Sequence, residues 1–207
     1  MANLDQDIYN TAILEGFRPE VAKYIVGQAR LESADYTSSV FQKNNNMYGM
    51  KFVGQPLATR GSLAPLSERS KTCQQGGNCV DSDHYAKYNT PQDSAKDVIQ
   101  MLYKKTRNGI GFDELNSSTS AEDFAKKLKT RNYFGNADIS TSEGQSEALS
   151  YAKGILAKFK KFSVVEVTID SLKGAYDYGK KHYLKLGLGL LITTAFAFWY
   201  YKKKYKK

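Results

Sequence analysis

The feature that most constrains this chain is an apolar segment near the end of its sequence. Residues 186–201 are 16 consecutive uncharged, mostly apolar residues, and extension back to Tyr183 adds one charge, Lys185. At about 1.5 Å per residue, these 19 residues would span roughly 28 Å as a helix, close to the hydrocarbon thickness of a bilayer. Aromatic residues stand at both boundaries, as in membrane helices. The sequence predicts a transmembrane helix over 184–201 and a basic tail over 202–207; the alternative is a buried core helix.

Charge divides the chain into two unequal parts. Residues 1–157 hold 18 Lys+Arg and 18 Asp+Glu, whereas residues 158–207 hold 12 Lys+Arg and 3 Asp+Glu and so carry the whole net charge of +9. The basic balance therefore gives no reason to expect a nucleic-acid partner. We expect the lysines to meet anionic lipid head groups, although simple solvation of the segment's flanks would also explain them. Lysines on both sides leave the orientation in the membrane open.

The remaining residues are enough for one folded domain, which we place at 1–160 and connect to the membrane segment by residues 161–183. Periodic apolar residues predict helices there, and a stretch rich in Gly, Pro, Ser and Thr between them predicts an irregular β-hairpin lobe. The expected fold class is α+β, mainly helical with a small hairpin lobe and a C-terminal transmembrane helix. The predicted helices cover residues 4–15, 19–33, 91–106, 121–130 and 143–162, and the lobe covers 51–90.

One predicted helix carries a single carboxylate at its end. Pro19 suits the first turn of this helix, and its apolar stripe consists of Val21, Ala22, Ile25, Val26 and Ala29. Glu32 follows the stripe. A lone Glu at a helix end is ordinarily a solvated surface residue, but in a partly apolar cleft its pKa rises toward neutrality and it can act as a proton donor.

A polar turn follows about a dozen residues later. Residues 45–51 read Asn-Asn-Met-Tyr-Gly-Met-Lys. Asparagine side chains can hold such a turn against a helix end, Tyr48 can stack on a sugar ring, and Gly49 permits a close backbone approach. We expect this turn to fold over the end of the helix that carries Glu32.

The pairing resembles the catalytic segment of the peptidoglycan N-acetylglucosaminidases of glycoside hydrolase family 73, which carry Ala-x-x-Glu-Ser followed by Asn-Asn-x-Phe-Gly-Ile-Lys. The resemblance covers about residues 8–160. It implies a lysozyme-like helical fold and hydrolysis of the β-1,4 bond between N-acetylglucosamine and N-acetylmuramic acid in a glycan strand. It also implies that Glu32 is the general acid and that Asn45, Asn46 and Tyr48 bind the substrate.

The resemblance also places a second carboxylate in the lobe. Glu68 in Ser67-Glu68-Arg69 fits the family's Thr-x-Glu, with Asp81 and Asp83 as rival candidates. Carboxyl groups about 6.5–9.5 Å apart would suit inversion and about 5–5.5 Å a covalent nucleophile, while the substrate's acetamido group could attack instead. Further along, Tyr133 matches a family tyrosine that approaches the active site. Tyr151 is similar in position to the tyrosine of the family's last helix, but for it we expect ordinary helix packing.

Two cysteines, Cys73 and Cys79, lie six residues apart in the lobe. The spacing fits a disulfide at a hairpin tip, or two free thiols in a reducing compartment. It does not fit a zinc site, because His84 is the nearest histidine and stands alone. We expect no metal and no organic cofactor.

Other functions fit parts of the sequence. A lytic transglycosylase or muramidase shares the fold, but usually has Gly-Leu-Met-Gln after the catalytic segment, where this chain has Tyr-Gly-Met-Lys. An inactive wall-binding structural virion protein and a membrane-permeabilising basic tail are the remaining alternatives. The first residues are acidic and contain no apolar signal region, so we expect a virion protein in the lipid layer of a phage, with capsid or spike proteins as possible partners; a bacterial cell envelope is the alternative location.

Overall fold

The computed structural model describes residues 4–104, 106 and 108–159. Helices dominate, and one two-stranded antiparallel sheet accompanies them, so the predicted α+β class is confirmed. The elements in chain order are α1 (Leu4–Leu14), α2 (Pro19–Glu32), α3 (Ser39–Asn44), β1 (Ala58–Leu63), η1 (Leu66–Glu68), α4 (Lys71–Gln74), η2 (Asp81–Asp83), β2 (His84–Tyr88), α5 (Pro91–Tyr103), α6 (Phe112–Asn116), α7 (Ala121–Thr130) and α8 (Ser142–Phe159).

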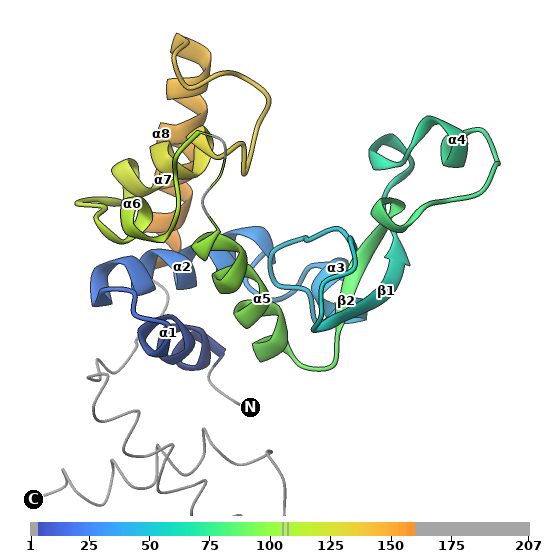
Figure 1. The fold of residues 1–207 in the computed structure, drawn as a ribbon, viewed down its shortest axis with the longest axis horizontal. Coiled ribbons are helices and arrows are strands. Elements are labelled where there is room, and N and C mark those ends of the chain that lie inside the picture. Colours follow the sequence, from blue (N-terminus) through green and yellow to red (C-terminus); the bar gives the residue numbers. More distant parts are fainter. Residues whose placement is uncertain (1–3, 105, 107, 160–207) are drawn as a thin grey trace, which may run out of the picture.

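Helix α2 lies at the centre of the helical body, where it packs against α1, α7 and α8 (Figure 1). Its predicted apolar stripe is confirmed, because all five residues of that stripe are fully buried. Burying each large aliphatic side chain contributes about 1.5–3 kcal/mol, so the stripe fixes the position of everything at the end of α2. Helix α5 ends earlier than predicted because Lys104 leaves the helical conformation (φ −70°, ψ 122°).

The β-lobe, defined here as residues 51–88, extends to one side of the helices, with α4 near its far tip (Figure 1). Strands β1 and β2 pair from Ala58 opposite Tyr88 to Leu63 opposite His84, and an irregularity between Arg60 and Leu63 shifts the register. Such a bulge bends and twists the strand that contains it. The predicted hairpin lobe is thus present, with short helical turns inserted between its strands.

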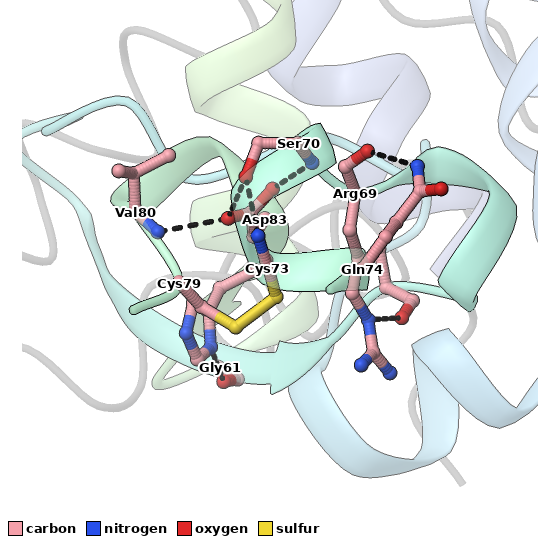
Figure 2. Close-up of a disulfide and its surroundings, with 10 residues drawn as sticks. Gly61, Arg69, Ser70, Cys73, Gln74, Cys79, Val80 and Asp83 are labelled. Atoms are coloured by element: carbon pink, nitrogen blue, oxygen red, sulfur yellow. Dashed lines mark hydrogen bonds between the residues drawn. A yellow bond between two sulfur atoms is a disulfide. The ribbon is translucent and has the colours of Figure 1, made fainter. Parts of the chain in front are cut away.

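The tip of the β-lobe is held by a disulfide and by one buried carboxylate (Figure 2). The structure joins the sulfur atoms of Cys73 and Cys79. The carboxylate of Asp83 accepts hydrogen bonds from the backbone and hydroxyl of Ser70 and from the backbone N–H of Val80. These donors, the Ser70 N–H first, lower the pKa of Asp83. These hydrogen bonds therefore hold the segment after η1 next to the start of β2.

The predicted transmembrane helix over 184–201 lies outside the described residues, as do the basic tail and the connecting segment over 161–183. Among the helices at 4–159 that the structure describes, none combines the length and the apolar character needed to cross a bilayer.

Candidate active site

A groove of about 610 Å³ runs between the end of α2 and the β-lobe, and both predicted carboxylates, Glu32 and Glu68, line it. The sequence separates them by a helix, a turn and a strand, and the fold brings them to one concave surface. The other lining residues come from the start of α3 and the turn after it, from β2, from the end of α5 and the segment after it, and from the segment after α7: Ser38, Val40, Tyr48, Gly49, Met50, Lys51, Tyr85, Met101, Thr106, Arg131, Asn132, Tyr133 and Phe134.

A tight turn in the left-handed conformation begins two residues after Glu32. Ala34, Asp35 and Tyr36 have φ angles of 50°, 55° and 66°, a conformation that costs residues with a Cβ roughly 1–2 kcal/mol each. The hydroxyl of Ser33 donates to the carbonyl of Ala29 and accepts from the N–H of Tyr36, which closes the end of the helix. The turn stops α2 abruptly and leaves Glu32 at the edge of the groove.

A charged network ties this turn to α1 and α8. Arg30 donates to Asp5 at 2.6 Å and to Asp35 at 3.1 Å, and the hydroxyl of Tyr36 donates to Asp5 at 2.7 Å. Lys158 of α8 pairs with Asp35 at 2.7 Å. Because Asp5 is only 4% exposed, these charge-assisted hydrogen bonds form where water competes weakly. The network offsets the cost of the left-handed residues.

The carboxyl of Glu32 is suited to hold a proton. Burial raises its pKa above the usual value, and a hydrogen bond from the Tyr151 hydroxyl, 2.5 Å from Oε1, opposes part of that rise. A carboxyl group that stays protonated to higher pH can donate its proton to a leaving oxygen. Tyr151 thus does more than the packing role expected from sequence.

Asn45 and Asn46 hold the polar turn in place. Asn45 ends α3 with φ 51°, and its amide donates to the backbone carbonyls of Tyr88 and Asn89. Asn46 is buried; its amide donates to the carbonyls of Met50 and Ala86, and its oxygen accepts from the N–H of Met50. Neither residue is among those that line the groove, and both side chains make internal bonds that position the turn. Their contact with substrate stays a prediction.

Replacing Asn46 with alanine should destabilise the fold by about 2–3 kcal/mol, because its three hydrogen bonds to the carbonyls of Met50 and Ala86 and to the N–H of Met50 would be lost in the interior. Urea unfolding of the variant would measure this loss. Asn78→Ala, at an exposed position near the lobe tip, is the matched control and should leave the midpoint unchanged. Equal midpoints for the two variants would contradict the role given to Asn46.

Glu68 is held at the groove by two side chains of the same lobe. Its Oε2 accepts from Nζ of Lys51 at 2.7 Å and from the hydroxyl of Tyr85 at 3.2 Å, and the Lys51 ammonium lies 4.4 Å from the Tyr85 ring centre. The carboxylate is 47% exposed, so the ion pair adds little to stability and serves chiefly to orient Glu68.

The two rival carboxylates have other partners. Asp81 forms an ion pair with Arg60 on the exposed side of the lobe, and Asp83 is the buried acceptor at the lobe tip. Neither lines the groove. Of the three candidates for the second carboxylate, Glu68 is therefore the one that shares a groove with Glu32.

Tyr48 and Tyr133, predicted to bind substrate, both line the groove. The Tyr48 ring is 4% exposed, and its hydroxyl donates to the carbonyl of Ile25 at 3.4 Å. Burial raises the pKa of both phenols, so both hydroxyls stay protonated. Their contact with a sugar stays a prediction.

Sequence reasoning missed several lining residues. The guanidinium of Arg131 donates to the carbonyls of Met101, Leu102, Lys104 and Ile110 and so caps the end of α5. Phe134 stacks on Tyr151 with ring centres 4.0 Å apart. Lys51 belongs to a motif that the sequence displays, whereas no local pattern reveals the contacts of Arg131 or Phe134.

The β-lobe also contains a group of possible metal ligands. Ligand atoms of Cys73, Cys79 and Asp83 lie within 4.8 Å of one another. Because the two sulfur atoms are bonded to each other, they offer no thiolate to a metal ion. We therefore interpret this cluster as a structural feature that holds the loop after Glu68 in place.

Removing the disulfide with the double variant Cys73→Ser, Cys79→Ser should lower the free energy of unfolding by about 2 kcal/mol, the value for closing a short loop. Amide hydrogen exchange should locate the loosening at residues 64–83, with α2 and α8 unchanged. Faster exchange spread evenly over the helices would contradict a local role of the disulfide.

The groove is lined by two carboxyl groups, one partly buried and hydrogen-bonded and the other paired with a lysine, and glycoside hydrolases use a pair of carboxyl groups of this kind. The sequence model of the Glucosaminidase family, described as mannosyl-glycoprotein endo-beta-N-acetylglucosaminidase, matches residues 13–185. The chain belongs to this family, as the sequence resemblance predicted, and is an endo-β-N-acetylglucosaminidase. Searches of curated proteins and of solved structures found no match. The family supports peptidoglycan hydrolase activity.

Proposed function

We propose that this chain cleaves the β-1,4 bond after N-acetylglucosamine in peptidoglycan strands, with Glu32 as general acid and Glu68 as second carboxylate. The observation that carries the proposal is the shared groove: a partly buried carboxyl with a raised pKa lies on the helical side, and a lysine-paired carboxylate lies on the lobe side. Different environments that separate the protonation states of two carboxyl groups are the usual basis for assigning acid and base roles.

In the proposed reaction, the carboxyl of Glu32 gives its proton to the bridging oxygen while the bond from that oxygen to the anomeric carbon breaks. Positive charge develops on the sugar ring, and the carboxylate of Glu68 stabilises it or directs the attacking group. Water then adds to the anomeric carbon, and the proton that it loses passes to the Glu68 carboxylate or back to the Glu32 carboxylate. Lys51 and Tyr85 keep Glu68 oriented through these steps.

The test is mass spectrometry of muropeptides released from purified peptidoglycan by the full chain. After borohydride reduction, reduced N-acetylglucosamine at the new chain ends supports the proposal. Reduced N-acetylmuramic acid would identify a muramidase, and an anhydro-muramyl end would identify a lytic transglycosylase; either result contradicts the proposal. The matched blank is Glu32→Gln, which should release nothing above background.

We further propose that the hydrolase acts while tethered to a lipid bilayer by residues 184–201. The length of that segment, its aromatic borders and its flanking lysines support this. The full chain should float with liposomes in a density gradient, and Leu190→Lys with Leu191→Lys should remain at the bottom. Flotation of that double variant would contradict the tether.

The setting that we propose for the tether is the membrane of a phage particle, where the catalytic domain would open the cell wall locally during entry and contact capsid or spike proteins. A wall-cleaving domain on a lipid anchor suits that task. Detection of the protein in purified membrane-containing particles would support this setting. Its presence in bacterial envelopes alone, with none in particles, would contradict it.

A further inference from the structure

Helix α8 brings one hydroxyl directly to the proposed acid. Tyr151 and Glu32 are separated by 119 residues, and the hydroxyl of Tyr151 donates to Oε1 of Glu32 at 2.5 Å. Gly154, three residues after Tyr151, makes this reach possible. A Cβ at Gly154 would lie 3.0 Å from Cδ2 of Leu31, so glycine lets α8 pack closely against the last turn of α2.

The ring of Tyr151 is fixed from its other side. Phe134 stacks on it with an angle of 11° between the rings. The carbonyl of Phe134 accepts from Nζ of Lys129 at 3.1 Å, and this buried ammonium also pairs with Glu147 of α8. Phe134 is therefore held by α7 and Tyr151 belongs to α8, so the Tyr151 hydroxyl has little freedom to leave Glu32.

A buried amide lies near the same hydroxyl. Gln28 lies one helical turn before Glu32 on α2 and is fully buried. Burial raises the pKa values of Tyr133 and Tyr151, and the Gln28 amide opposes part of that rise, although its nitrogen and oxygen form no complete hydrogen bond within the described residues. Polar groups so deep in a protein are costly unless they support a specific arrangement.

We propose that Tyr151 is a positioning residue that selects which oxygen of Glu32 delivers the proton. This inference rests on the proposed role of Glu32. Because Oε1 accepts the hydroxyl hydrogen of Tyr151, the acidic proton of Glu32 resides on Oε2. In the reaction the Oε2–H bond breaks and an O–H bond to the leaving sugar oxygen forms. The carboxylate that remains keeps its hydrogen bond from Tyr151, which is stronger to the charged form.

The titratable groups that face Glu32 come from three elements: Tyr48 from the polar turn, Tyr133 from the segment after α7, and Tyr151 from α8. Within the described residues, the causes that set the pKa of Glu32 are burial, which raises it, and the Tyr151 hydrogen bond, which lowers it. Removing that hydroxyl should therefore raise the pKa of Glu32 further. Since the acid acts only when protonated, activity is lost as the pH rises through this pKa.

The experiment compares kcat and KM of the full chain and of Tyr151→Phe on soluble peptidoglycan fragments across pH. We expect kcat to fall about 10- to 100-fold with KM nearly unchanged, because the proton is no longer directed. The alkaline limb of the pH profile should move to higher pH. Tyr88→Phe is the matched control: its buried hydroxyl donates to Asp97 at 2.6 Å outside the groove, and its loss should reduce stability without moving the limb.

Three outcomes decide the inference. A Tyr151→Phe variant with wild-type kcat and an unmoved limb would overturn it. A variant with reduced kcat but an unmoved limb, and with a loss of melting temperature equal to that of Tyr88→Phe, would show a structural role and also overturn it. If the wild-type chain is inactive, or if Glu32→Gln remains active, the proposed function itself fails, and that result is distinct from the other two.

Discussion

Replacement of Glu32 by glutamine is expected to abolish muropeptide release, with a rate about 10²- to 10⁴-fold below that of the wild-type chain. Glutamine has nearly the same shape, and its side-chain oxygen can still accept the Tyr151 hydroxyl, so the groove should be unchanged. What disappears is the transferable proton. Release of soluble fragments from purified peptidoglycan, followed over time, measures the effect.

The same variant should gain stability at neutral pH. Burial raises the pKa of Glu32, so the folded state holds this proton more tightly than the unfolded chain does. The corresponding stability is complete at low pH and is lost as the pH rises through the raised pKa. Glutamine never ionises, and Glu32→Gln should therefore melt at a higher temperature than wild type at neutral pH. Glu20→Gln, at the exposed start of the same helix, should change neither activity nor melting.

Replacement of Glu68 by glutamine should lower kcat about 100-fold or more, because the lobe would no longer present a negative charge to the reacting sugar. The fold should be retained, since Glu68 is half-exposed. Steady-state rates on soluble fragments measure the change.

Asp81→Asn is the control for that variant, because it removes an exposed ion pair with Arg60 from the same lobe. It should keep wild-type kcat. If instead Asp81→Asn loses activity and Glu68→Gln retains it, the second carboxylate has been assigned to the wrong residue.

The sequence predicts those parts of the fold that depend on local patterns. The apolar period of α2 places Glu32 at its end, and the hydroxyl of Ser120, a residue type that favours helix N-caps, accepts from the N–H of Asp123 at the start of α7. These features need only neighbouring residues, so the sequence displays them directly. The sequence also predicts the position of the polar turn. It does not predict that the asparagines of this turn bind the backbone of β2 and of the turn itself.

The missing parts of the site depend on contacts between distant segments. The bond from Tyr151 to Glu32 requires the packing of α8 on α2, and the choice of Glu68 over Asp81 depends on contacts within the lobe that pair Glu68 with Lys51 and Asp81 with Arg60. None of the three consecutive left-handed residues after Glu32 is a glycine, so the sequence gives no sign of this conformation. Their conformation follows from the network around Arg30 and Asp5, which joins three helices.

The bond between Cys73 and Cys79 has a practical consequence for anyone who purifies this enzyme. A reducing cytosol keeps such thiols reduced, so protein collected from it would lack the bond at the lobe tip until it is oxidised. Thiol titration before each assay would show what fraction of the chains in a batch contains the disulfide.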